Sequence, residues 1–249
     1  MLQKIYTENI YLFSVDTMIP LISYLNVAAG VVSLLIALHL ILSASVRREQ
    51  IYFLFTFIFI GLHFILLGAP IITQNAAIIK IVFDGAMFCM YLGGASWAGA
   101  VEVLFIKKNW DKIAVAGIAL LGVISTLLES LYAKTPVRLP AGLLVFWSID
   151  YPRWLAYIDS IAAGALILGS ALFFLHGYRT SMDRSTRTKS ALIFAGLIIL
   201  FVAAMFGYVW ASAPQVWSIA GEGVFAFIAL VILSFGVEND FYDTHNIHH

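Results

Sequence analysis

The chain has 249 residues, of which 62% are hydrophobic and only 11% are charged. Soluble domains carry about a quarter charged residues, so this composition excludes an ordinary water-facing surface and predicts a membrane protein. The formal net charge is zero, with 14 basic and 14 acidic residues, which argues against a nucleic-acid partner. The single cysteine, Cys89, excludes an intrachain disulfide framework and a cysteine-based metal site.

Seven apolar runs follow an N-terminal segment, residues 1–18, which carries Glu8 and Asp16 and lacks the apolar core of a signal peptide. Each run approaches the roughly 20 apolar residues that a bilayer-spanning helix needs. In chain order the runs are 19–43, 51–68, 79–106, 113–133, 155–178, 190–212 and 217–237. The sequence therefore predicts an all-α polytopic fold, with one seven-helix membrane domain over residues 19–237 and a short tail, residues 238–249.

Lysine and arginine are distributed unequally between the two sets of predicted loops. Nine of them follow the first, third and fifth helices, whereas five lie in the remaining segments. The nine are Arg47, Arg48, Lys107, Lys108, Lys112, Arg179, Arg184, Arg187 and Lys189. Because basic residues favour the cytoplasmic side, we expect the N-terminus outside, the C-terminus inside, and a multi-pass protein of the plasma or inner membrane.

The longest predicted loop, residues 134–154, joins the fourth and fifth helices and is aromatic rather than rich in glycine and serine. It contains Trp147, Tyr151 and Trp154 together with three prolines. Tryptophan and tyrosine favour the membrane–water interface. We expect this loop to lie at the outer interface as a short helix or a lid.

Ionisable side chains inside a membrane are costly and commonly mark function. The predicted topology places several such groups in the outer half of the bilayer or near its middle, where together they would form a cation, amine or proton site open to the outside. The candidate ligand-binding residues are Asp84, Asp159, Glu222, Arg153 and His63. Glu129 lies at a similar depth, but a hydrated position at the headgroup level is its simpler explanation.

Two histidines, His39 and His176, fall at matching depth in the predicted inner quarter of the bilayer. Paired histidines on separate helices are typical ligands of a b-type haem. The alternative is that each side chain reaches the interface or bonds a carbonyl. The chain lacks a nucleophile elbow, a phosphate-binding glycine loop and a His-Glu-x-x-His motif, so neither an enzyme nor a metal site is favoured.

The predicted layout resembles that of microbial rhodopsins, with Phe206-Gly-Tyr-Val-Trp210 similar to part of their sixth helix. Their seventh helix carries a lysine that holds retinal. The corresponding stretch here, residues 219–228, contains Glu222 but no lysine. We therefore expect no covalently bound retinal.

The sequence more closely resembles the seven-helix sensor region of some bacterial histidine kinases over residues 19–237. The shared features are a short arginine-containing loop after the first helix, Val103-Leu-Phe-Ile-Lys-Lys-Asn-Trp110, the outer Phe146-Trp147, and Arg187-x-Lys-Ser-Ala-Leu opening the sixth helix. The resemblance implies a sensor fold but carries over no site residues. Because the chain ends where a kinase would begin, it implies signalling through a separate protein.

Three functions remain open at this point. The first is a sensor or receptor-like module that binds a small ligand in the outer half and acts on a membrane or cytoplasmic partner. The second is a haem-, quinone- or pigment-binding, or anchoring, subunit of a membrane redox complex. The third is a small transporter or channel, which the absence of proline-broken helices and inverted repeats disfavours.

Overall fold

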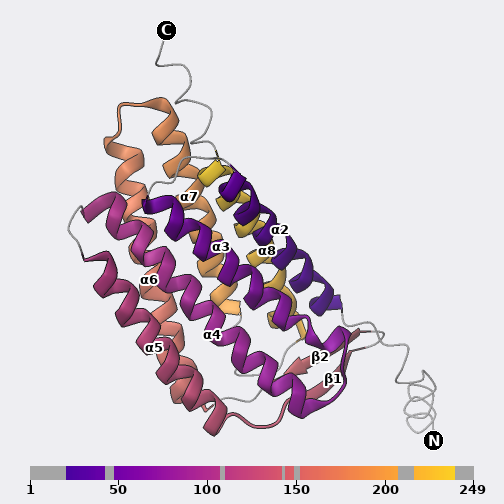
Figure 1. Cartoon of the computed structure of the whole chain (residues 1–249). Helices are drawn as coiled ribbons and strands as arrows, with labels where there is room; N and C mark the ends of the chain where they lie inside the picture. The colour runs from indigo at the N-terminus through magenta and orange to yellow at the C-terminus, as the bar shows by residue number, and fades with distance from the viewer. Residues whose placement is uncertain are drawn as a thin grey trace, which may run out of the picture.

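The computed structural model describes residues 21–42, 48–106, 110–141, 144–148, 152–206 and 216–238. Within these residues the chain forms seven long helices side by side and one short hairpin (Figure 1). The helices are α2 (Leu21–Leu42), α3 (Arg48–Leu67), α4 (Ala76–Val101), α5 (Asp111–Tyr132), α6 (Arg153–Thr180), α7 (Arg184–Ala204) and α8 (Val216–Glu238). A 3-10 turn, η3 (Ala69–Ile71), follows α3, and a π-helical turn, η4 (Glu102–Ile106), extends α4.

Six of the described helices, α2 to α7, are long and apolar enough to cross a membrane, and α8 adds a shorter apolar segment, Gly221–Val237. The shortest helix of the six, α3, has 20 residues before η3 extends it. At 1.5 Å per residue, 20 residues span about 30 Å, the thickness of the bilayer's hydrocarbon core. Large apolar side chains such as Leu35, Ile81 and Leu172 are exposed on these helices. The structure is therefore that of a multi-pass membrane protein.

The helices pack mainly against their neighbours in the chain, and α8 packs against α2. The exception is α6, which packs extensively against α7 but only lightly against α4 and α5. We call this contact of α6 with α4 and α5 the seam. The core beside it contains Phe57 and Trp97, and the Trp97 ring N–H donates a hydrogen bond to Ser170 Oγ across the seam at 3.0 Å.

Small residues allow a close approach between α2 and α3. A Cβ placed on Gly30 would lie 2.8 Å from the Gly61 carbonyl oxygen and 2.7 Å from Ile65 Cγ1. A Cβ on Gly61 would lie 2.8 Å from Leu34 Cδ2, so neither glycine has room for a side chain. The glycines therefore hold the two helices in close contact, as small residues commonly do in membranes.

The hairpin and the α6–α7 connection lie at opposite ends of the bundle (Figure 1). The hairpin consists of β1 (Val137–Ala141) and β2 (Leu144–Ser148), paired antiparallel. We name its side the strand end, and the side of Arg48, Arg184 and Lys189 the basic end. The expectation of a short helix in the loop 134–154 is wrong, because its valine and aromatic residues favour strand pairing.

Two helices, α4 and α7, begin before the apolar runs that predicted them, because a polar side chain caps each one. Asn75 Oδ1 accepts hydrogen bonds from the N–H groups of Ala77 (3.0 Å) and Ile78 (3.3 Å), and α4 begins at Ala76 rather than 79. Asp183 Oδ2 accepts from the Thr186 N–H at 2.7 Å, and α7 begins at Arg184 rather than 190. Bonds from Thr186 hold the pKa of Asp183 below its usual 3.8, so the carboxylate caps α7 at neutral pH.

Parts of the predicted chain lie outside the described residues. They include the N-terminal segment 1–18, the end of the sixth predicted helix from residue 207, the tail from residue 239, and the loop residues Arg47, Lys107, Lys108 and Tyr151. Where the description and the predicted runs overlap, each run falls on one helix, except that the run 79–106 covers α4 and the π-helical turn η4.

Candidate functional site

A buried polar cluster joins α4, α5 and α6 toward the strand end. Asp159 of α6 is 2% exposed, and its Oδ1 accepts hydrogen bonds from the Tyr91 hydroxyl of α4 and from Ser125 Oγ of α5, the latter at 2.6 Å. Tyr91 and Ser125 are themselves buried. One carboxylate oxygen therefore connects three helices across the seam.

A second carboxyl group, that of Glu129, lies against Asp159. Glu129 is 1% exposed and lies one helical turn beyond Ser125 on the same face of α5. Its carboxyl group is within hydrogen-bonding reach of Asp159. Among the described residues, Glu129 Oε2 has no hydrogen-bond partner. The simpler explanation of Glu129 as a hydrated headgroup residue is thus wrong, because the packing of α4 and α6 around α5 removes it from water.

Asp84 of α4 provides a third carboxylate, half-buried and close enough to influence Glu129 electrostatically. It interacts with the Ser130 hydroxyl and with the Lys80 ammonium group, and Lys80 Nζ also donates to the Ser130 carbonyl at 2.9 Å. Asp84 Oδ1 is buried and has no partner within the described part of the chain. The carboxyl cluster, defined as Asp84, Glu129 and Asp159, thus has two unpaired buried oxygens.

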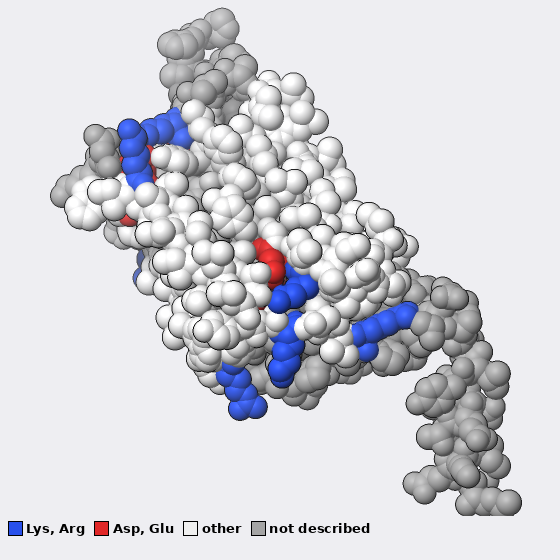
Figure 2. Space-filling view, turned by 60° about the horizontal axis from the view of Figure 1, so that its bottom comes forward, with Lys and Arg blue, Asp and Glu red and all other residues white. Residues whose placement is uncertain are grey.

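Two carboxylates in contact inside a low-dielectric region repel each other unless a proton or another cation lies between them. Lys80 and Ser130 form the outer boundary of the cluster. Figure 2, turned toward the strand end, shows a small acidic patch beside basic side chains on an otherwise mostly uncharged surface. The arrangement can therefore bind a small cation drawn from the strand-end side.

His63 is buried, at 8% exposure, on α3 beside α4. Its ring Nδ1–H donates to the Ala86 carbonyl oxygen of α4 at 2.8 Å. A carbonyl oxygen can only accept, so this bond fixes the ring tautomer. His63 therefore fastens α3 to α4 two residues beyond Asp84.

Glu222 and Arg153 lie apart from the carboxyl cluster. Glu222 is half-buried on α8, a helix that packs mainly against α7 and α2. Arg153 is exposed as the first residue of α6. Of the five predicted ligand-binding residues, the structure thus brings Asp84 and Asp159 together.

His39 and His176 are both exposed, on α2 and α6 respectively. Helix α2 packs mainly against α3 and α8, whereas α6 packs mainly against α7. Within the described ranges, no group of three or more histidine, cysteine or acidic side chains is arranged to hold a metal ion. Haem ligation by these two histidines stays a prediction.

Sequence reasoning did not assign four residues of this region to the predicted ligand-binding site: Glu129, Tyr91, Ser125 and Lys80. A usable signal was present: Ser125 and Glu129 are four residues apart within an apolar run and so share one helix face. The partners Tyr91 and Asp159 come from other helices, and only the packing order reveals them.

A separate polar contact ties α5 to α3 at the basic end. Asp111 is fully buried, and its Oδ2 accepts hydrogen bonds from Arg48 Nη2 and the Tyr52 hydroxyl, both at 2.6 Å. Both donors come from α3. This contact anchors the first turn of α5, so α5 is held to α3 and α4 while its contact with α6 remains slight.

Comparison with known proteins assigns neither a family nor a function to this chain. The chain matches no protein-family model, and no curated protein is significantly similar to it.

Proposed function

We propose that the chain is an integral membrane sensor, or receptor-like module, in which a small cation binds at the carboxyl cluster and shifts α6 along the seam. The cation is a proton or a protonated amine. The observation that carries the proposal is the buried contact of Glu129 with Asp159, with Glu129 Oε2 left unpaired among the described residues.

The proposed orientation has seven spans with the strand end outside. The excess of lysine and arginine in the loops of the basic end supports a cytoplasmic location for that end. The 23 residues of α8 reach about 34 Å, enough for a seventh span. In this orientation Lys80, Asp84 and Ser130 face the outer side, where an external cation arrives.

The seam offers a route from the cluster to the other end of the bundle. Asp159 holds α6 to α4 and α5 through Tyr91 and Ser125, and the Trp97 ring of α4 packs against the Phe174 ring of α6 nearer the basic end. A cation that neutralises the cluster changes the strength of these charged hydrogen bonds. A ligand shifts a conformational equilibrium only if it binds the two states with different affinity. Few bonds hold the seam, so a cation that changes their strength can shift the equilibrium between two positions of α6.

Infrared difference spectroscopy tests cation binding at the cluster. The chain in lipid nanodiscs is exposed in turn to a pH step and to ammonium, and carboxyl bands are recorded. We expect at least one cation to change these bands in the wild type, and the change to disappear in Glu129→Gln and in Asp159→Asn. Glu102→Gln, a carboxyl change in η4 at the basic end, serves as the control and should leave the response intact. Identical spectra under all conditions would remove the proposal.

A small cation transporter is the second candidate, because buried carboxylates also line ion pathways. The two functions differ in net movement of the ion. A sensor in liposomes under an ion gradient shows the same flux as empty vesicles, whereas a transporter shows added flux that Asp159→Asn abolishes.

A further inference from the structure

A cavity opens at the basic end, away from the carboxyl cluster. It has a volume of about 360 Å³ and is lined by residues of α2, α3, η4, α6, α7 and α8. Small-molecule sites commonly measure about 300–1,000 Å³ and combine apolar walls with a few polar groups. The cavity is thus large enough for one small molecule.

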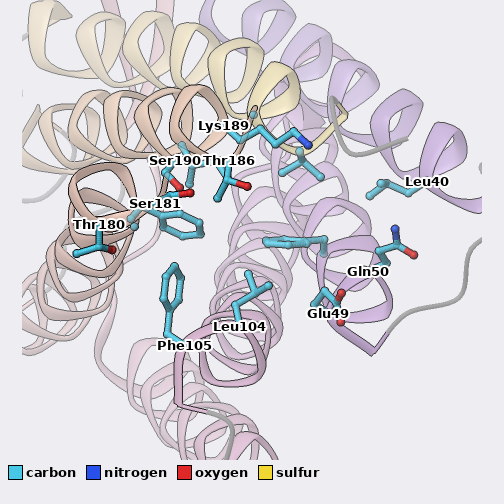
Figure 3. Close-up of a pocket in the computed structure, with 16 residues that line it drawn as sticks. Leu40, Glu49, Gln50, Leu104, Phe105, Thr180, Ser181, Thr186, Lys189 and Ser190 are labelled. Carbon is cyan, nitrogen blue, oxygen red and sulfur yellow. The ribbon is translucent and has the colours of Figure 1, made fainter. Parts of the chain in front are cut away.

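The cavity has one acid and one base among its lining residues, on different walls. Glu49, with Gln50 beside it, comes from the first turn of α3, whereas Lys189 comes from α7. Figure 3 shows Glu49 on one side of the hollow and Lys189, Thr186 and Ser190 on the other. The two charges therefore fit the two ends of a zwitterion rather than a simple anion or cation.

Ser190 adds a hydroxyl group to the lysine wall. Ser190 is buried, at 6% exposure, and lines the cavity beside Lys189. Gly177 of α6 faces it: a Cβ on this glycine would lie 3.1 Å from Ser190 Oγ. Since a larger residue at 177 would crowd this hydroxyl, the glycine keeps the wall open to a ligand.

Aromatic rings form the apolar part of the cavity. Phe53 of α3, Phe105 of η4 and Phe174 of α6 all line it, and the rings of Phe105 and Phe174 meet edge to face at 5.2 Å between centroids. Such a surface favours a flat or branched apolar group.

From these three features we infer that the cavity binds a small zwitterion with an apolar body, of the free aromatic amino acid class. The anionic group meets Lys189 and Ser190, the ammonium group meets Glu49, and the body lies against Phe105 and Phe174. This inference does not depend on the cation site at the other end of the bundle.

Isothermal titration calorimetry with free phenylalanine tests the inference on the whole chain in phosphatidylcholine nanodiscs. Phenethylamine, which lacks the carboxylate, and hydrocinnamate, which lacks the amine, are the comparison probes. We expect phenylalanine to bind at least about tenfold more tightly than either probe, because each loses a hydrogen bond to a charged group.

Two variants locate the binding. Lys189→Gln should weaken phenylalanine binding about tenfold and abolish its advantage over phenethylamine, and Glu49→Gln should do the same relative to hydrocinnamate. Arg184→Gln removes a positive charge from the first turn of α7 without touching the cavity and should leave binding unchanged. Equal affinity in Lys189→Gln, Glu49→Gln and the wild type would overturn the inference.

A lipid headgroup can supply the same chemistry, since phosphatidylethanolamine also carries an ammonium and an anion on an apolar body. Native mass spectrometry of protein from phosphatidylethanolamine nanodiscs distinguishes this source. Retention of that lipid by the wild type and its loss in Lys189→Gln would support the site with a lipid occupant. If neither phenylalanine nor the lipid binds, the inference is wrong.

Discussion

At the scale of single residues, Glu129 and Asp159 have unequal roles despite their contact. Asp159 accepts two hydrogen bonds from other helices, whereas Glu129 Oε2 accepts none from the described residues. Asp159 therefore contributes to stability as well as to cation binding. Glu129 adds a buried charge that costs free energy unless a cation neutralises it.

Substitutions at these two positions should have opposite effects on stability. Asp159→Ala leaves the Tyr91 and Ser125 hydroxyls without their acceptor, so we expect a loss of about 1–3 kcal/mol. Glu129→Gln keeps the side-chain shape and removes the repulsion, so the variant should be at least as stable as the wild type. Thermal unfolding in detergent measures both, and a destabilised Glu129→Gln beside an unaffected Asp159→Ala would contradict this division of roles.

At the scale of helices, the bundle contains both tight and looser contacts. Gly30 and Gly61 bring α2 and α3 together with no room for a side chain. The seam between α6 and its neighbours α4 and α5 is less closely packed. It combines hydrogen bonds from Tyr91 and Ser125 to Asp159 and from Trp97 to Ser170 with a ring contact between Trp97 and Phe174. Movement is therefore expected at the seam and not between α2 and α3.

A pair of glycine substitutions tests the tight contact. In Gly30→Ala the new methyl group would lie 2.8 Å from a backbone oxygen that cannot move independently, and we expect a cost of about 1–3 kcal/mol. Gly117→Ala on α5 is the matched control, because nothing lies within 4 Å of its Cβ position. Alanine should be neutral there or stabilise the helix by up to about 1 kcal/mol. Equal thermal shifts in both variants would mean that the α2–α3 contact is looser than described.

At the scale of the whole molecule, the sequence predicted the helices well because a bilayer demands long apolar runs that are visible without any knowledge of packing. The α4 and α7 starts were misplaced, since the caps Asn75 and Asp183 are polar and lie before the apolar runs. The candidate site was predicted only in part. Burial of Glu129 and the pairing of Tyr91 with Asp159 depend on which helices are neighbours, which hydrophobicity does not encode.

The proposed orientation predicts which end of the bundle is accessible from outside the cell. Ile72 is 91% exposed at the strand end and Met182 is fully exposed at the basic end. With Cys89→Ala as background, a membrane-impermeant maleimide applied to intact cells should label Ile72→Cys and leave Met182→Cys unlabelled. The reverse labelling pattern would invert the topology and place the carboxyl cluster on the inner side.

The most direct test of the account measures whether a cation at the strand end moves α6 at the basic end. Ile113 on α5 and Met182 after α6 are both exposed positions. Spin labels attached at Ile113→Cys and Met182→Cys report the distance across the seam by double electron–electron resonance spectroscopy. The account predicts that the cation that alters the carboxyl bands also shifts this distance by about 1–2 Å or more, and that Glu129→Gln and Asp159→Asn abolish the shift. A distance that stays constant while the infrared bands report cation binding would contradict the sensor function.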